Sequence, residues 1–489
     1  MVKTFIDTFL GKAPIWYKLT ILIFLVINPI LFFWVDPFIA GWVLLIEFIF
    51  TLALALQCYP IPAGGLLALE AVIIGLTTPD SVYKEIIANL PTLLLLIFMV
   101  AGIYYLKDLI FLIFTKVFIS FQKKATLSFM FCLISATLSA FLDALTLMAI
   151  LVAVCFNFFA IYHRVASSLA SGSEEQNLKA AKEFDDFRGF LCNIVMHGAI
   201  GTALGGTMTL IGEPQNLMIG TTMNWSFGGF FAHCSVVSVP VALVGLMLCP
   251  LLEIFKAPGF GYQLPEKARE LILKDYYKKA DQVSQQSLLL YITQGVVAVL
   301  LIFALAFHVA EIGLIGISLI IILSAFTGIT KEHDFAGAFS NAMPFVTLII
   351  IFFAILAVVH DQHLVSPLAA WVFTFEGREQ LLALYFVNGT LSFISDNVFI
   401  ASVFIGEVSK AFQAGLFSPE WYEKLAVVVN MGTNVPAVAT PNGQAAFLFL
   451  LTSSLAPVLK LSYMRMVLLA LPYTIAMTLT GALSIYFLL

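Results

Sequence analysis

Residues 392–399 read SFISDNVF and place an aspartate and an asparagine between two apolar runs. The nearest basic residues along the chain are Arg378 and Lys410, so Asp396 has no local counter-charge. A bare carboxylate inside a membrane costs at least about 2.5 kcal/mol. The sequence around this stretch therefore indicates both the type of fold and the function of Asp396.

The composition is that of a membrane protein. Of 489 residues, 61% are hydrophobic and only 11% are charged, whereas soluble proteins carry about 25% charged residues. Apolar windows recur along the chain, and a single crossing needs roughly 20 apolar residues. Several windows are too long for one crossing and others are too short. The sequence therefore predicts an all-α polytopic membrane protein of about a dozen crossings, with hairpins and broken helices; a barrel would show alternating segments of about ten residues.

Basic residues gather in two places and predict the orientation. Lys3, Lys12 and Lys18 precede the first apolar run, and six more lie between Lys256 and Lys279. The positive-inside rule puts both groups on the cytoplasmic side. The predicted segments are an N-terminal cytoplasmic segment 1–19 without a signal-peptide pattern, a first repeat 20–256, a cytoplasmic linker 257–286 that is helical in part, and a second repeat 287–489.

Other classes of site have little support in the sequence. The six cysteines form no CxxC pair, which favours buried, reduced packing residues over a disulfide or a metal site. No basic patch with interleaved aromatic residues suggests nucleic acid. We expect no cofactor, and we expect membrane lipid and small inorganic cations as partners.

The two halves of the chain repeat two motifs in the same order. TLSAFLD at 137–143 matches TLSFISD at 390–396 in its Thr, Leu, Ser and Asp. GTMTLIGEPQN at 206–216 and GTNVPAVATPN at 432–442 both open with Gly-Thr and end in Asn. The matches indicate an internal repeat. They do not by themselves distinguish inverted from parallel repeats.

Glycine and proline within apolar windows predict breaks in membrane helices. Proline removes a backbone donor and clashes with the preceding turn, and such breaks persist only where they are buried in protein or line a wet cavity. The predicted breaks lie at 206–216 and 432–443, and the two TLS motifs are predicted as the tips of re-entrant hairpins. The residues expected to break the helices are Gly206, Pro214, Gly432, Pro436 and Pro441.

The isolated carboxylates predict a cation site. Asp143 and Asp396 have two remedies in an apolar setting, which are to take a proton or to bind a metal cation. If one carboxylate cannot hold both, competition plus alternating access suffices for antiport. Sodium is a hard cation that prefers oxygen ligands, so Asp143 and Asp396 are the predicted sodium ligands. The other predicted ion- or proton-binding residues are Thr137, Ser139, Glu213, Asn216, Thr390, Ser392, Ser395, Asn397, Thr433, Asn434, Thr440 and Asn442.

Several of these residues have plainer interpretations. A membrane-embedded Ser or Thr is often only a contact between helices, and each aspartate could pair with a distant Lys or Arg. Glu213 could cap a helix start instead of binding an ion. Glu47 and Glu70 could serve a proton path or face the headgroups. His360, Asp361 and His363 resemble a metal motif only faintly, and a wet helix end explains them better.

Long motifs carry a family resemblance over almost the whole chain. SAFLDALT (139–146), GTALGGTMTLIGEPQNLMIG (201–220), SFISDNVF (392–399) and NMGTNVPAVATPNGQAAFLFLLTSSLAP (430–457) resemble the NhaB-type sodium/proton antiporters. WYKLTILIFLVINP (16–29) and HRVASS (163–168) resemble that family too. More broadly, the pattern is similar to the ion transporter superfamily.

The resemblance implies a fold and an activity. The implied fold has two inverted repeats with re-entrant hairpins and discontinuous helices, in which a mobile transport core lies beside a fixed scaffold. The implied activity is that of a secondary transporter, not an enzyme: electrogenic exchange of Na⁺ or Li⁺ for H⁺ in a bacterial inner membrane, by elevator-type alternating access. A homodimer and roles in pH homeostasis and salt tolerance also follow from the resemblance.

Three rival functions share some of these features. A sodium-coupled carboxylate symporter has the same scaffold, but aspartates at both tips would repel an organic anion. An intramembrane aspartyl protease also uses two aspartates, yet the residues before Asp143 and Asp396 do not give a GxGD-like context. A passive channel is disfavoured by broken helices at a midplane site, which are typical of carriers.

Overall fold

The computed structural model describes residues 2–168, 174–280 and 284–489, and within these ranges every regular element is a helix. Seven helices of this described part are long and apolar enough to cross a membrane, or eight when the bent pair Pro79–Ala88 and Leu90–Tyr104 is taken as one span. Four further apolar helices are shorter than 18 residues. The prediction of an all-α polytopic membrane protein is confirmed, although fewer helices than a dozen are long enough to cross alone.

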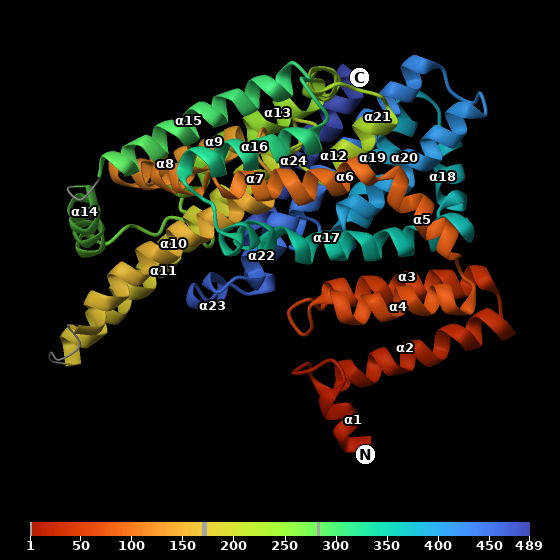
Figure 1. Cartoon of the computed structure of the whole chain (residues 1–489), viewed down its shortest axis with the longest axis horizontal. Helices are drawn as coiled ribbons and strands as arrows, with labels where there is room; N and C mark the ends of the chain where they lie inside the picture. The colour runs from red at the N-terminus through yellow and green to blue at the C-terminus, as the bar shows by residue number, and fades with distance from the viewer. Residues whose placement is uncertain (1, 169–173, 281–283) are drawn as a thin grey trace.

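The N-terminal helices form a stack at one side of the molecule. Helix α2 packs on α3 and α4, and the stack meets the rest of the protein through α17 (Figure 1). Asp36 caps α3 by accepting from the N–H groups of Phe38 (2.9 Å) and Ile39 (3.2 Å), as a helix start requires. The helices named here are α1 (Val2–Thr8), α2 (Ile15–Trp34), α3 (Pro37–Ala53), α4 (Pro60–Ile74) and α17 (Glu332–Asp361).

The remaining helices divide into two series with the same order. In each series a helix ends two to four residues before an aspartate, a second helix begins directly after that aspartate, and a third helix is interrupted before a short helix. The first series is α9 (Lys124–Ser139), α10 (Ala144–Ser168), α11 (Glu174–Gly206), α12 (Pro214–Thr222) and α13 (Phe227–Ile254). The second is α19 (Gly377–Ile394), α20 (Asn397–Gln413), α21 (Pro419–Asn434), the 3₁₀ turn η2 (Pro436–Ala439), α22 (Ala445–Thr452), α23 (Leu455–Val458) and α24 (Tyr463–Leu488).

Other helices connect and surround these two series. The segment predicted as a linker contains α14 (Glu266–Ala280), and its residues 281–283 lie outside the described residues. The boundaries of the repeats and their inverted relation stay predictions. The surrounding helices are α5 (Pro79–Ala88), α6 (Leu90–Leu94), the π-helical turn η1 (Leu95–Met99), α7 (Val100–Tyr104), α8 (Lys107–Ser120), α15 (Gln285–Ala306), α16 (Ile312–Thr327) and α18 (Ser366–Phe373).

A buried polar network joins four helices of the core. Glu253 of α13 accepts from Lys124 of α9 (3.2 Å), from His197 of α11 (2.8 Å) and from Ser128 (3.2 Å). The other ring nitrogen of His197 is 2.7 Å from the hydroxyl of Tyr473 of α24. Because both charges of the Lys124–Glu253 pair are buried, each depends on the other for compensation.

All six cysteines are free and five of them are buried. Cys132 and Cys249, for example, are fully buried within the hydrophobic core. The five buried cysteines therefore act as small packing residues, as the sequence predicted.

Candidate cation site

Asp143 is the residue before α10 and its side chain caps that helix. Its Oδ2 accepts from the backbone N–H of Thr146 (3.0 Å) and from the Thr146 hydroxyl (3.3 Å). Asp143 is only 2% exposed. A carboxylate here faces the positive end of the α10 dipole, which stabilises negative charge.

Asp396 has the same relation to α20. Its Oδ1 accepts from the N–H groups of Val398 (2.8 Å) and Phe399 (3.4 Å). Within residues 2–168, 174–280 and 284–489, neither aspartate forms an ion pair. The alternative of a distant Lys or Arg partner is therefore wrong for the described part of the chain. The N–H groups of a helix N-terminus stabilise each carboxylate instead. From the sequence alone, only protonation, cation binding and ion pairing are expected of these two residues.

Glu213 precedes α12, but its side chain does not cap that helix. It is 3% exposed, and its Oε1 has no hydrogen-bond partner among the described residues. The carboxylate lies against Gly206, where an added Cβ would be 3.0 Å from Oε1. It is also close enough to Asp143 and Asp396 for both to repel its charge. The sequence allowed Glu213 to be a cap, whereas the two aspartates are the caps.

The first interrupted helix is closed by a side-chain amide. Helix α11 ends at Gly206 and α12 begins at Pro214. The Asn216 amide donates to the carbonyls of Gly206 (2.7 Å) and Thr209 (2.7 Å), which α-helical bonding leaves free at the break. Asn216 is a predicted ion ligand. In the structure its side-chain nitrogen bridges two backbone carbonyls of the interrupted segment.

The second interruption has a comparable fastening. Helix α21 ends at Asn434 and α22 begins at Ala445, with η2 between them. The Gln444 amide donates to the Asn434 carbonyl (3.2 Å). The backbone of Gly443 is packed against the second tip, because an added Cβ would be 2.6 Å from the Ser392 carbonyl. Only glycine fits at this crossing of two backbones.

A threonine hydroxyl ties each tip to the neighbouring break. Thr209 donates to the carbonyl of Ala140 at the first tip (2.6 Å), and Thr440 donates to the carbonyl of Phe393 at the second (2.7 Å). Ala140 and Phe393 are at matching positions of the two TLS motifs. Each tip is therefore fixed to its own break.

Amide side chains join the two breaks to one another. Gln215 donates to Asn434 Oδ1 (2.8 Å), and Asn434 Nδ2 is 3.0 Å from Asn216 Oδ1 and 3.0 Å from Asn430 Oδ1. All four side chains are buried. The network spans more than 200 residues of sequence and locks the two interrupted helices into one unit.

Several buried oxygens around the tips and breaks have no hydrogen-bond partner among the described residues. Such groups are costly unless an ion or water satisfies them. They are Ser139 Oγ, Glu213 Oε1, Ser392 Oγ, Asn397 Oδ1 and Gln444 Oε1. Hydroxyl, carboxylate and amide oxygens are the ligand types that a hard cation prefers.

Other predicted ligands have different surroundings. Thr137 and Thr390 are exposed, and each hydroxyl donates to a carbonyl of its own helix, at Leu133 (2.9 Å) and Phe386 (2.7 Å). The structure does not bring these two side chains to the buried site. Thr433 is buried but likewise donates to its own helix, at Val429 (2.9 Å). Ser395 is also buried.

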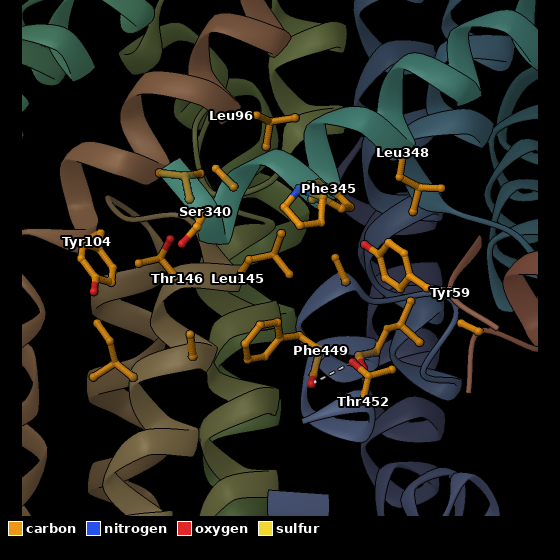
Figure 2. A pocket seen from close by; sticks show the side chains of 18 of the residues that line it. Tyr59, Leu96, Tyr104, Leu145, Thr146, Ser340, Phe345, Leu348, Phe449 and Thr452 are labelled. Atoms are coloured by element: carbon orange, nitrogen blue, oxygen red, sulfur yellow. Dashed lines mark hydrogen bonds between the residues drawn. The ribbon is translucent and has the colours of Figure 1, made fainter. Parts of the chain in front are cut away.

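Two cavities border Asp396. A pocket of about 560 Å³ is lined by Asp396, Thr146 and Asn442 among many apolar side chains (Figure 2). A void of about 10 Å³ lies among Glu213, Gln215, Asp396 and Asn397, which is the size of about one water molecule. Phe345 lines both cavities, and in Figure 2 its ring lies among the side chains that point into the larger pocket.

No cluster of three or more His, Cys, Asp or Glu side chains suited to a metal occurs in the part of the chain that the structure describes. The faint motif at 360–363 is a helix end: His360 contacts Glu85 (2.7 Å) and Asp361 accepts from Thr77 (2.8 Å).

Comparison with known proteins identifies the family. Residues 1–489 match the family described as bacterial Na⁺/H⁺ antiporter B (NhaB). The chain belongs to the NhaB family. It is 49% identical over 496 residues to the Na⁺/H⁺ antiporter NhaB of Marinobacter nauticus, covering 99% of this chain and 98% of that protein. It is 50% identical to the Na⁺/H⁺ antiporter NhaB of Photobacterium profundum, covering 100% of this chain and 93% of that protein. It is 51% identical to the Na⁺/H⁺ antiporter NhaB of Shewanella denitrificans, covering 98% of this chain and 92% of that protein. NhaB proteins are antiporters and not enzymes.

Sequence reasoning missed four polar residues of this NhaB site. Thr146 bonds Asp143, Thr209 fastens the first tip, and Gln215 and Asn430 belong to the amide network. Gln215 lies within the GEPQN motif, so the cluster of polar residues around Pro214 was the available signal. Thr146 is three residues after Asp143, the spacing of a helix cap.

Proposed function

We propose that this chain exchanges Na⁺ for H⁺ across the bacterial inner membrane, with both cations competing for the buried carboxylates. Its similarity to proteins named Na⁺/H⁺ antiporter NhaB supports the exchange. The observation that carries the site is the void between Glu213 and Asp396, where Glu213 Oε1 and Asn397 Oδ1 have no hydrogen-bond partner within the described part of the chain. Sodium bound there would be held by Asp396, Glu213 and Asn397.

Asp143 is the second carboxylate of the proposed mechanism. It is buried, it caps α10 by accepting from the Thr146 N–H, and the Ser139 hydroxyl at the same tip has no hydrogen-bond partner among the described residues. With Glu213 repelled by both aspartates, three negative charges cannot all remain uncompensated in a buried site. Loading a proton removes the charge that holds sodium, and loading sodium favours loss of the proton. This exclusion makes the exchange obligatory.

We further propose that the tips and breaks move together as the transport core of an elevator. The threonine bonds fix each tip to its break, and the amide network fixes the two breaks to each other. The stack of α2, α3 and α4 lies to one side of this unit (Figure 1) and is the proposed part of the fixed scaffold. Two inverted repeats would let such a core present the site to either side.

The remaining expectations also belong to this proposal. Li⁺ is a hard cation and would use the same oxygen ligands. The exchange is proposed to be electrogenic, to serve pH homeostasis and salt tolerance, and to need no cofactor. The N-terminus and the linker 257–286 are proposed to face the cytoplasm, and the chain is proposed to form a homodimer within membrane lipid.

Reconstituted vesicles test the proposal. Addition of Na⁺ alone should dissipate an imposed pH gradient, and the reversal potential should give the number of charges moved. A symporter would require an added organic anion, and a channel would show neither saturation nor uptake driven against a gradient. If Na⁺ alone leaves the pH gradient intact in protein that is correctly inserted, the antiport proposal is wrong.

A further inference from the structure

Two glutamates meet inside the N-terminal stack, away from the tips and breaks. Glu47 of α3 and Glu70 of α4 are 3% and 9% exposed, and Asn28 of α2 is fully buried between them. The Asn28 amide nitrogen donates to Glu47 Oε2 (2.7 Å) and to Glu70 Oε2 (2.8 Å). The two carboxylate oxygens therefore lie within about 5.5 Å of each other. The sequence alternative of a headgroup position does not fit their burial.

No positive charge compensates these two acids within the described part of the chain. Neither glutamate has an ion pair there. Lys18 is the basic residue of α2, and its ammonium group donates instead to the carbonyls of Ile6, Asp7 and Gly11. Two like charges at this separation cannot both persist in an apolar interior. The pair must hold a cation of some kind.

The Asn28 side chain indicates which cation. Its Oδ1 is buried and has no hydrogen-bond donor among the described residues. The two carboxylates and this carbonyl are all acceptors, and the donors that the three side chains supply are the amide N–H groups of Asn28, which already bond to the carboxylates. No donor of the cluster is left for Asn28 Oδ1. The amide N–H groups already occupy the space between the carboxylates where a metal ion would have to bind. A carboxylic O–H supplies a donor and removes one charge without displacing the amide.

We propose that Glu47, Glu70 and Asn28 form a proton-binding site in the N-terminal stack, in which the two glutamates share a single proton. Two carboxyl groups that share one proton are a known solution to close like charges. The site is separate from the proposed sodium site and does not select or bind alkali metal. Its proton neutralises the contact between α2, α3 and α4, and it does not depend on antiport by the core.

Infrared spectroscopy of the purified full chain tests the proposal. Glutamate labelled with ¹³C at the side-chain carboxyl separates glutamic acid bands from those of aspartic acid. At neutral pH, the wild type should show a protonated glutamic acid C=O band that shifts in D₂O. Glu47→Gln/Glu70→Gln should lose the part of this band that the matched control Glu213→Gln keeps. Addition of NaCl should leave the band of Glu213→Gln unchanged, because that variant lacks the glutamate proposed to bind sodium in the core.

Two results would overturn the proposal. If the double variant keeps the full band, both glutamates are ionised at neutral pH and no proton is shared. If NaCl removes the band from Glu213→Gln, the pair binds sodium instead. Should the double variant not fold, Glu47→Gln and Glu70→Gln are measured singly, and a band unchanged in position and intensity in both is equally decisive against it.

Discussion

Asp143 and Asp396 occupy the same structural position in two series of helices, each one residue before a helix whose own backbone N–H groups donate to its carboxylate. Both are buried or nearly so, and neither forms an ion pair with a described residue. The helix terminus favours the ionised form without neutralising it. In the proposed mechanism, this partly stabilised charge is the one that a mobile cation would compensate.

Substituting Asp143 or Asp396 with asparagine removes the negative charge but keeps a side chain that can cap the helix. Asparagine is as good a cap as aspartate, so Asp143→Asn and Asp396→Asn should each insert normally but lose almost all Na⁺-dependent proton movement. A pH-sensitive dye in everted vesicles measures the movement, and immunodetection measures the amount of protein. Wild-type exchange in both variants, from mildly acid to mildly alkaline pH, would show that the carboxylates are not essential.

The cap itself should contribute separately to stability. Asp396→Ala loses the bonds to Val398 and Phe399, which should cost about 1 kcal/mol, whereas Asp396→Asn should stay close to the wild type. Thermal unfolding of the detergent-purified protein compares the two variants. Equal melting temperatures would mean that the helix does not depend on this cap.

Of the residues that the repeated motif predicts for this site, the structure buries some and exposes others. The matching TLS motifs located two equivalent helix starts, because Asp143 and Asp396 both act as helix caps. The same matching included Thr137 and Thr390, which are exposed. Residues two apart on a helix point to nearly opposite faces, so Thr137 cannot share a face with Ser139. A repeated sequence motif does not indicate which face of the helix is buried.

The amide network could not be predicted in the same way. Gln215 and Asn434 are 219 residues apart, and nothing local to either residue names its partner. Glu47, Asn28 and Glu70 also meet only through the packing of three helices. Apolar windows predict that helices exist, but not which of their polar faces come together.

The Thr146 hydroxyl should tune the first carboxylate. Thr146→Val removes the 3.3 Å bond to Asp143 but keeps the backbone bond. Loss of one hydrogen bond to a charged group is worth about 1.5–3 kcal/mol, and this long one should be at the lower end, so the KM for Na⁺ should change by about tenfold. Thr146→Ser should restore the wild-type KM. An unchanged KM in the valine variant would exclude a role for the hydroxyl.

The amide network should be needed to keep the two breaks together. Asn434→Leu leaves Gln215 Nε2 and Asn216 Oδ1 without partners in a buried site, at a cost of about 1–3 kcal/mol for each group. The melting temperature should fall, and transport should fall with it. Thr390→Val, at an exposed position, is the matched control and should change stability by less than about 0.5 kcal/mol. A similar melting temperature in both variants would contradict the role of Asn434.

For the buried Lys124–Glu253 pair, a second substitution should restore the stability that the first one removes. Glu253→Gln leaves the buried ammonium group of Lys124 uncompensated, which should cost about 3–5 kcal/mol. Adding Lys124→Met removes that charge and fills its volume with an apolar side chain, so the double variant should regain most of the lost stability. Thermal unfolding of both variants gives the coupling energy. If Lys124→Met makes Glu253→Gln still less stable, the bond of the ammonium group to the buried Phe190 carbonyl (3.3 Å) contributes more to stability than the uncompensated charge costs.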